Sequence, residues 1–96
     1  VSWAKCVYDF FNEKKTGHES VVLRMRRLAM SMKQDKKYRI EEMKNLNAKI
    51  AREYATLSPL TLERDLNKLV SFNLLLKEDV FYKTNSMENI AKIHYF

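Results

Sequence analysis

The chain contains one glycine, Gly17, and one proline, Pro59, among its 96 residues. Glycine and proline supply much of the chemistry of tight turns, so a chain with so few of them can form only a few hairpins. Hydrophobic residues make up 46% of the sequence and charged residues 31%, a balance that is typical of folded domains. A chain of this length can bury one modest core. We therefore expect one compact domain in which helices dominate.

Apolar residues recur at helical spacing in several segments. The pattern predicts helices over 2–13, 19–33, 41–54 and 86–96, and a further helix that begins at Pro59 and ends before Asn73. The segment Tyr38-Arg39-Ile40 is a candidate for a very short strand. After Asn73, the apolar runs 74–76 and 80–83 flank the polar residues 77–79, which predicts a short hairpin.

The pair Ser58-Pro59 separates two of the predicted helices. Serine is a favoured N-cap and proline a favoured first residue of a helix. Proline also biases the residue before it away from helical dihedral angles, so the chain should turn at Ser58. Helix, short turn and capped helix form a helix-turn-helix, and the hairpin that follows is a candidate wing.

The stretch TLERDLNKLVSFNLL, residues 61–75, resembles the recognition helix and following strand of DeoR-type winged-helix regulators. It is equally similar to the C-terminal winged helix of bacterial Fic-family nucleotidyl-transferring proteins. The matching motif positions are Thr61, Arg64, Asp65, Leu66 and Leu69. The resemblance implies a mainly α, α+β fold: a winged helix-turn-helix with a short β-hairpin wing and extra N- and C-terminal helices.

We divide the chain accordingly into N-terminal helices (1–37), a winged helix-turn-helix core (38–85) and a C-terminal helix (86–96) within one compact domain. The first residue is Val1, and we expect the sequence to be a piece of a longer protein.

The predicted function is DNA binding, in transcription regulation or in DNA targeting within a larger protein. A recognition helix places its N-terminal part in the major groove, where arginine can pair with guanine or with a phosphate. Arg64 is the strongest candidate for that role, and the predicted wing and the basic loop before residue 40 are expected to add phosphate contacts. The candidate DNA-binding residues are Ser58, Thr61, Arg64, Asn67, Lys68, Lys77, Lys83, Lys36, Lys37 and Arg39.

Structural roles compete with these assignments. Arg64 can instead bridge back to the preceding helix, and Asp65 can brace the turn. The net charge is +6, but residues 24–52 carry a local +7 and residues 53–96 a local −1, so the positive charge precedes the predicted recognition helix. The alternative function is therefore a winged helix that binds protein instead of DNA, for example a dimerisation module or the C-terminal domain of a Fic-like enzyme.

Other chemistry is not indicated by the sequence. The Fic catalytic motif is absent from these residues, so we expect no enzymatic activity from them. His18 and His94 lie far apart without a ligand spacing, and no glycine-rich loop exists, so we expect no metal and no cofactor. Cys6 lies on an apolar helix face and is expected to be a buried, inert thiol.

The sequence contains no membrane segment or signal peptide, and the single cysteine suits a reducing interior, so a cytoplasmic location is expected. The apolar faces of the two terminal helices either pack together or form a homodimer contact.

Overall fold

The computed structural model describes residues 2–13 and 17–94. Two helices, α1 (Trp3–Glu13) and α2 (Glu19–Met30), precede a short strand, β1 (Tyr38–Arg39). Helices α3 (Ile40–Met43), α4 (Ala48–Ala55) and α5 (Pro59–Ser71) follow. A hairpin of β2 (Leu75–Glu78) and β3 (Phe81–Thr84) comes next, and α6 (Met87–His94) is the last described element.

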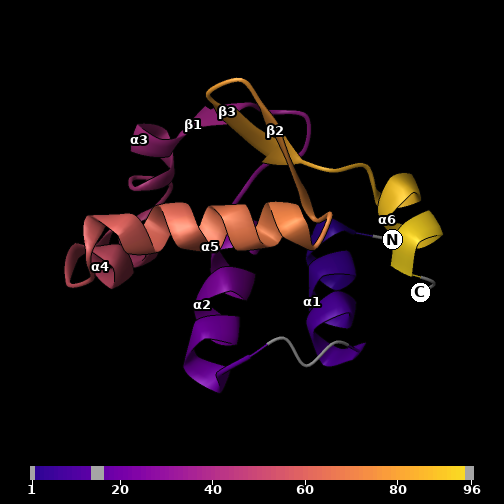
Figure 1. Ribbon diagram of the computed structural model, residues 1–96, viewed down its shortest axis with the longest axis horizontal. Coiled ribbons are helices and arrows are strands. Elements are labelled where there is room, and N and C mark those ends of the chain that lie inside the picture. The colour runs from indigo at the N-terminus through magenta and orange to yellow at the C-terminus, as the bar shows by residue number, and fades with distance from the viewer. Residues whose placement is uncertain (1, 14–16, 95–96) are drawn as a thin grey trace.

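The three strands form one antiparallel sheet in the order β1-β3-β2. Helix α5 crosses the middle of the molecule, with the hairpin on one side and α1 and α2 on the other (Figure 1). The predicted fold class is confirmed: the domain is mainly helical, with a helix-turn-helix formed by α4 and α5 followed by a hairpin, and with additional helices at both ends.

The N-terminal helix belongs to this domain. The indole nitrogen of Trp3 donates a hydrogen bond of 2.8 Å to the backbone oxygen of Ala29, which joins α1 to α2. The ring of Phe10 lies 5.3 Å from that of Phe72, just after α5, and Ile90 of α6 is fully buried in the same core. Helices α1 and α6 contact each other, so the two apolar terminal faces meet within one chain.

Cys6 is buried in this core, as predicted. Burial, with a smaller contribution from the nearby carboxylate of Asp9, raises the pKa of its thiol. A thiol in such surroundings stays protonated and unreactive at neutral pH.

Local capping explains where α4 and α5 begin. The Ser58 side chain accepts a hydrogen bond from the backbone N–H of Leu60, and Pro59 is the first residue of α5, as predicted. The side chain of Asn47 accepts a hydrogen bond of 2.9 Å from the backbone N–H of Ile50 and caps α4.

Three predicted boundaries are wrong. The helix predicted over 41–54 is two helices, α3 and α4, separated by a turn, because the Asn47 cap starts a new helix. Helix α2 ends at Met30 instead of Lys33, and the hydroxyl of Ser31 donates to the backbone oxygen of Arg27 at its end.

The hairpin turn is also shorter than predicted. It consists of Asp79 and Val80, with a positive φ of 57° at Asp79, because Lys77 and Glu78 continue the ladder opposite Tyr82 and Phe81. Asn73 takes a φ of 64°, in accord with its predicted place at the end of a helix. The C-terminal residues 95–96 of the last predicted helix lie outside the described residues.

Candidate nucleic-acid interface

Asp65, the acidic residue of the family-like motif, is buried at the junction of three helices. Its carboxylate accepts hydrogen bonds from Arg24 of α2 at 2.6 and 3.0 Å and from the hydroxyl of Tyr54 of α4 at 2.6 Å. Its exposed fraction is 4%. The three bonds fix the rotation of α5 about its own axis, so Asp65 has the structural role that the sequence left open.

The electrostatics of this network follow from its burial. Desolvation, followed by the hydrogen bond to Asp65, raises the pKa of the Tyr54 hydroxyl. The hydrogen bond to Asp65 also raises the pKa of Arg24. Tyr54 therefore stays neutral and Arg24 charged. Sequence reasoning did not identify either partner, because Arg24 lies 41 residues from Asp65 and nothing in the local pattern connects them.

Arg64 lies beside Asp65 in sequence but points to solvent. Its side chain is exposed and forms no hydrogen bond or ion pair with any other residue of the described chain. The alternative in which Arg64 bridges back to an earlier helix is not observed, because Arg24 pairs with the motif carboxylate instead. The guanidinium of Arg64 keeps all its donors available for an external partner.

The outward face of α5 follows from the inward positions of its core residues. Leu62, Leu66 and Leu69 are buried together with Asp65. Because one turn of an α-helix contains 3.6 residues, Arg64, Asn67 and Lys68 lie on the side of α5 that faces away from the core. All three are exposed.

Thr61 and Lys68 lie where this outward face meets α2. A groove of about 390 Å³ runs between α2 and α5, and its lining includes Arg24, Thr61, Arg64 and Lys68. Three of these residues are cations. Arg24 is paired with Asp65, whereas Arg64 and Lys68 have no acidic partner within the described residues. The Lys68 ammonium lies 5.7 Å from the centre of the Phe72 ring. The groove offers an anion two cations and a hydroxyl.

Lys77 of β2 joins this surface from the hairpin. It pairs with Tyr82 across the ladder, and its ammonium lies 5.4 Å from the centre of the Tyr82 ring. The Tyr82 hydroxyl donates to the Asn67 side chain at 3.4 Å, so the hairpin is connected to the exposed side of α5. We call the surface formed by Ser58, Thr61, Arg64, Asn67, Lys68 and Lys77 the α5 face.

The other four predicted DNA-binding residues lie away from the α5 face. Side chains alternate between the two faces of a sheet. Tyr82 faces α5, so Phe81 and Lys83 point to the opposite side, and the pairing of Arg39 with Phe81 places Arg39 there too. Lys37 reaches the same side, where it forms an ion pair of 3.1 Å with Glu78.

Lys36 is separate from both groups. Its ammonium lies 5.0 Å from the centre of the Tyr38 ring, at the edge of the sheet.

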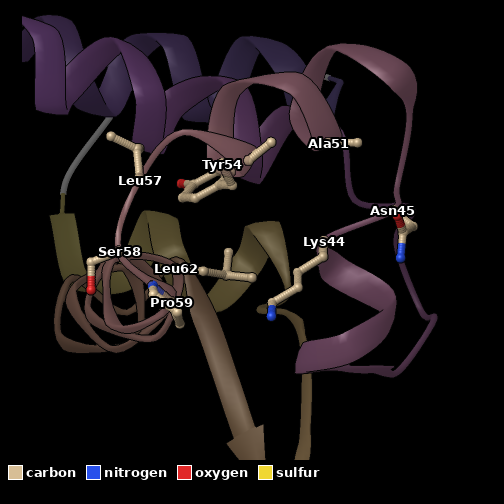
Figure 2. A pocket seen from close by; sticks show the side chains of 9 residues that line it. Lys44, Asn45, Ala51, Tyr54, Leu57, Ser58, Pro59 and Leu62 are labelled. Atoms are coloured by element: carbon tan, nitrogen blue, oxygen red, sulfur yellow. The ribbon is translucent and has the colours of Figure 1, made fainter.

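A pocket of about 320 Å³ lies at the turn of the helix-turn-helix, a feature that sequence reasoning did not anticipate. Figure 2 shows Tyr54 and Leu62 along its wall, Ser58 and Pro59 on one side and Lys44 on the other. The exposed Lys44 follows α3 directly, so the turn between α3 and α4 places it opposite the start of α5. The pocket touches the Asp65 network through Tyr54.

Within residues 2–13 and 17–94, no three histidine, cysteine or acidic side chains gather closely enough to hold a metal ion. No helix in the described part of the chain is long and apolar enough to cross a bilayer. Comparisons with protein-family models, with curated proteins and with solved structures gave no match to this chain. The class defined here, a mainly helical domain with a helix-turn-helix and a following hairpin, therefore rests on the fold itself.

Proposed function

We propose that this domain binds duplex DNA through the α5 face. The observation that carries the proposal is the contrast between two neighbours. Asp65 is buried and hydrogen-bonded to Arg24, whereas Arg64 is exposed and unpaired within the described chain. A helix held in one rotation by a buried carboxylate presents its outward arginine in a defined direction. Such preorganisation suits a residue that reads a base edge or clamps a phosphate.

The docking follows that of other helix-turn-helix domains. The N-terminal half of α5 enters the major groove, where Thr61 and Arg64 meet base edges or phosphates. Lys68 and Lys77 contact the backbone on either side. Glu63, also exposed on α5, tolerates this position only where it accepts a hydrogen bond from cytosine.

We expect the affinity of the domain for DNA to be modest and to come largely from electrostatic contacts with phosphates. Three cations of the α5 face, Arg64, Lys68 and Lys77, neutralise about three phosphates, so the logarithm of the binding constant should fall with the logarithm of salt with a slope of about −2.7. Lys37, Arg39 and Lys83 do not contribute, because they lie on the other side of the sheet.

The test is fluorescence anisotropy of random-sequence duplex DNA titrated with the domain at low and moderate salt. The variant Arg64→Ala/Lys68→Ala should bind at least about tenfold more weakly and lose about two units of salt slope. The matched control is Lys5→Ala/Lys92→Ala, which removes the same charge from exposed surface pairs. Equal weakening in both variants, or no binding by the folded domain at low salt, contradicts the proposal.

The regulatory context is also part of the proposal. The resemblance to DeoR-type regulators and to the C-terminal winged helix of bacterial Fic-family proteins suggests transcription regulation, or DNA targeting within a larger protein, in the cytoplasm. A homodimer on DNA stays a prediction. It would need a contact other than the apolar faces of α1 and α6, which meet each other in this chain.

One observation favours the alternative of a protein-binding module. Leu60, on the outward side of α5, is 55% exposed, and Glu63 lies three residues further along the helix. An exposed leucine beside a carboxylate suits a protein surface better than a phosphate backbone. A Leu60→Ser variant that leaves DNA binding intact while abolishing self-association would assign Leu60 to that second role.

A further inference from the structure

The pocket at the turn between α4 and α5, which we call the turn pocket, has the size and the lining of a small-molecule site. Its volume of about 320 Å³ lies at the lower end of the range of about 300–1,000 Å³ that is usual for such sites. Its wall is formed by the end of α3, by α4 and by the start of α5. Most of the lining is apolar: Ala51, Ala55, Leu57, Pro59 and Leu62. The turn pocket therefore suits a small ligand with an apolar body.

Tyr54 gives the turn pocket an aromatic wall. The side chain is buried, and its hydroxyl donates a hydrogen bond of 2.6 Å to Asp65, so the ring is held in one orientation. The ring and the fully buried Leu62 both line the pocket (Figure 2). An aromatic ring that is fixed in this way can stack on a flat ligand without losing conformational freedom.

Lys44 is the one charged side chain among the described residues that line the turn pocket. It is exposed and forms no ion pair with any described residue. Figure 2 shows its side chain extending from the end of α3 toward Leu62 of α5. The pocket thus combines apolar walls with one cation that has no partner.

The carboxylates of the surrounding helices leave this cation uncompensated. Asp65 and Glu53 are already paired with arginines of α2. Glu41 and Glu42 line a different cavity. Glu63 is exposed on α5, one residue after Leu62 and therefore turned from it by roughly 100° about the helix axis. No carboxylate of the described chain lines the turn pocket, so a bound anion meets attraction there.

We propose that the turn pocket binds a small aromatic monocarboxylate. Its carboxylate pairs with Lys44, and its ring lies against Tyr54 and Leu62. One unpaired cation matches one negative charge, whereas a phosphate monoester with a charge of about −2 would keep an unpaired charge beside apolar walls. The ligand contacts α3, α4 and α5 together, so binding stabilises their arrangement. The site does not depend on the proposed DNA binding, because Lys44 is not part of the α5 face.

The test is a titration of the ¹⁵N-labelled domain with phenylacetate, followed by the ¹H–¹⁵N NMR signals of its backbone amides. A ligand of about ten non-hydrogen atoms should bind with a Kd of about 1 mM. The signals of Lys44, Ala51 and Ala55 should shift. Phenylacetamide lacks the charge and acetate lacks the ring, so each should bind at least about fivefold more weakly than phenylacetate.

Two variants separate the charge from the cavity. Lys44→Met removes the ammonium and should weaken phenylacetate binding about fivefold. Lys49→Met is the matched control, because Lys49 is an exposed lysine of α4 outside the lining, and it should leave the Kd within about twofold. Ala55→Leu keeps the charge but fills the pocket, and it should also weaken binding. An otherwise unchanged NMR spectrum shows that each variant is folded.

Four outcomes would overturn the proposal. The first is the absence of shifts at Lys44, Ala51 and Ala55 with phenylacetate, and the second is equal binding of phenylacetamide. The third is equal weakening by Lys44→Met and Lys49→Met. The fourth is an equal or larger shift of the same signals with inorganic phosphate, which would assign Lys44 to a phosphate contact instead.

Discussion

Replacing Asp65 with alanine should destabilise the domain more than any exposed substitution on α5. The carboxylate accepts three hydrogen bonds from Arg24 and Tyr54, and the change leaves both donors without their acceptor in a buried site. Removal of one partner of a buried ion pair costs about 3–5 kcal/mol. The side chain of Arg24 keeps 17% of its surface exposed and can turn partly to water, so we expect the lower end, about 3 kcal/mol.

Urea unfolding followed by circular dichroism measures this loss. For a small domain with an m-value of about 1–3 kcal/mol/M, the midpoint should fall by at least about 1 M. Glu63→Ala, at an exposed position on the same helix, is the matched control and should stay within about 0.5 kcal/mol. A loss below about 1 kcal/mol for Asp65→Ala would refute the reasoning.

A triple variant separates a missing charge partner from a missing side chain. Arg24→Met, Tyr54→Phe and Asp65→Leu together leave no polar group of the network behind. Replacement of a whole buried network by apolar residues is often neutral or stabilising. The triple variant should therefore be more stable than Asp65→Ala alone, and a stability equal to or below that of Asp65→Ala would show that the network itself holds the three helices.

Two further predictions concern single side chains. Tyr54→Phe removes one charge-assisted hydrogen bond and should cost about 1.5–3 kcal/mol at neutral pH. Burial and the hydrogen bond to Asp65 raise the pKa of Tyr54 in the folded state above its ordinary value of 10.0, so the unfolded chain releases that proton first. The stabilisation contributed by Tyr54 should thus be fully present below pH 10 and be lost as the pH rises above it. Urea titrations at pH 9 and 11 should therefore show a smaller decrease in the free energy of unfolding for Tyr54→Phe than for the wild type. Asn47→Ala removes the N-cap of α4 and should cost about 1 kcal/mol in the same assay, and an unchanged midpoint would mean that packing alone separates α3 from α4.

Local chemistry explains which parts of the fold were predictable. Ser58, Pro59 and Asn73 act on the backbone beside them, through a side-chain cap, a fixed φ and a positive φ, so the limits of α5 could be predicted from sequence. The break between α3 and α4 could not be predicted, because the apolar residues on both sides of it continue one helical spacing: Met43, Leu46, Ile50 and Tyr54. Within such a periodic segment, nothing in the sequence distinguishes Asn47 as an N-cap from an asparagine on the surface of a continuous helix.

The distribution of cations over two surfaces was also beyond local reasoning. Lys77 and Lys83 are six residues apart on one hairpin, and both were predicted to contact DNA. The two-residue turn at Asp79 and Val80 pairs Lys77 with Tyr82, so Lys83 projects from the opposite side of the sheet. A turn of three residues would have changed this register, and no feature of the composition decides between the two turns.

The motif that suggested DNA binding is mostly a motif of folding. Of its five positions, Leu66 and Leu69 are fully buried and Asp65 is buried in an ion pair. These three residues specify how α5 sits against α2, α4 and the sheet, and any protein that needs this packing would retain them. Only Thr61 and Arg64 are left to touch a partner. A match to the motif is thus strong evidence for the orientation of α5 and weak evidence for its ligand. The behaviour of Arg64, and not of the motif as a whole, decides whether this helix-turn-helix reads DNA.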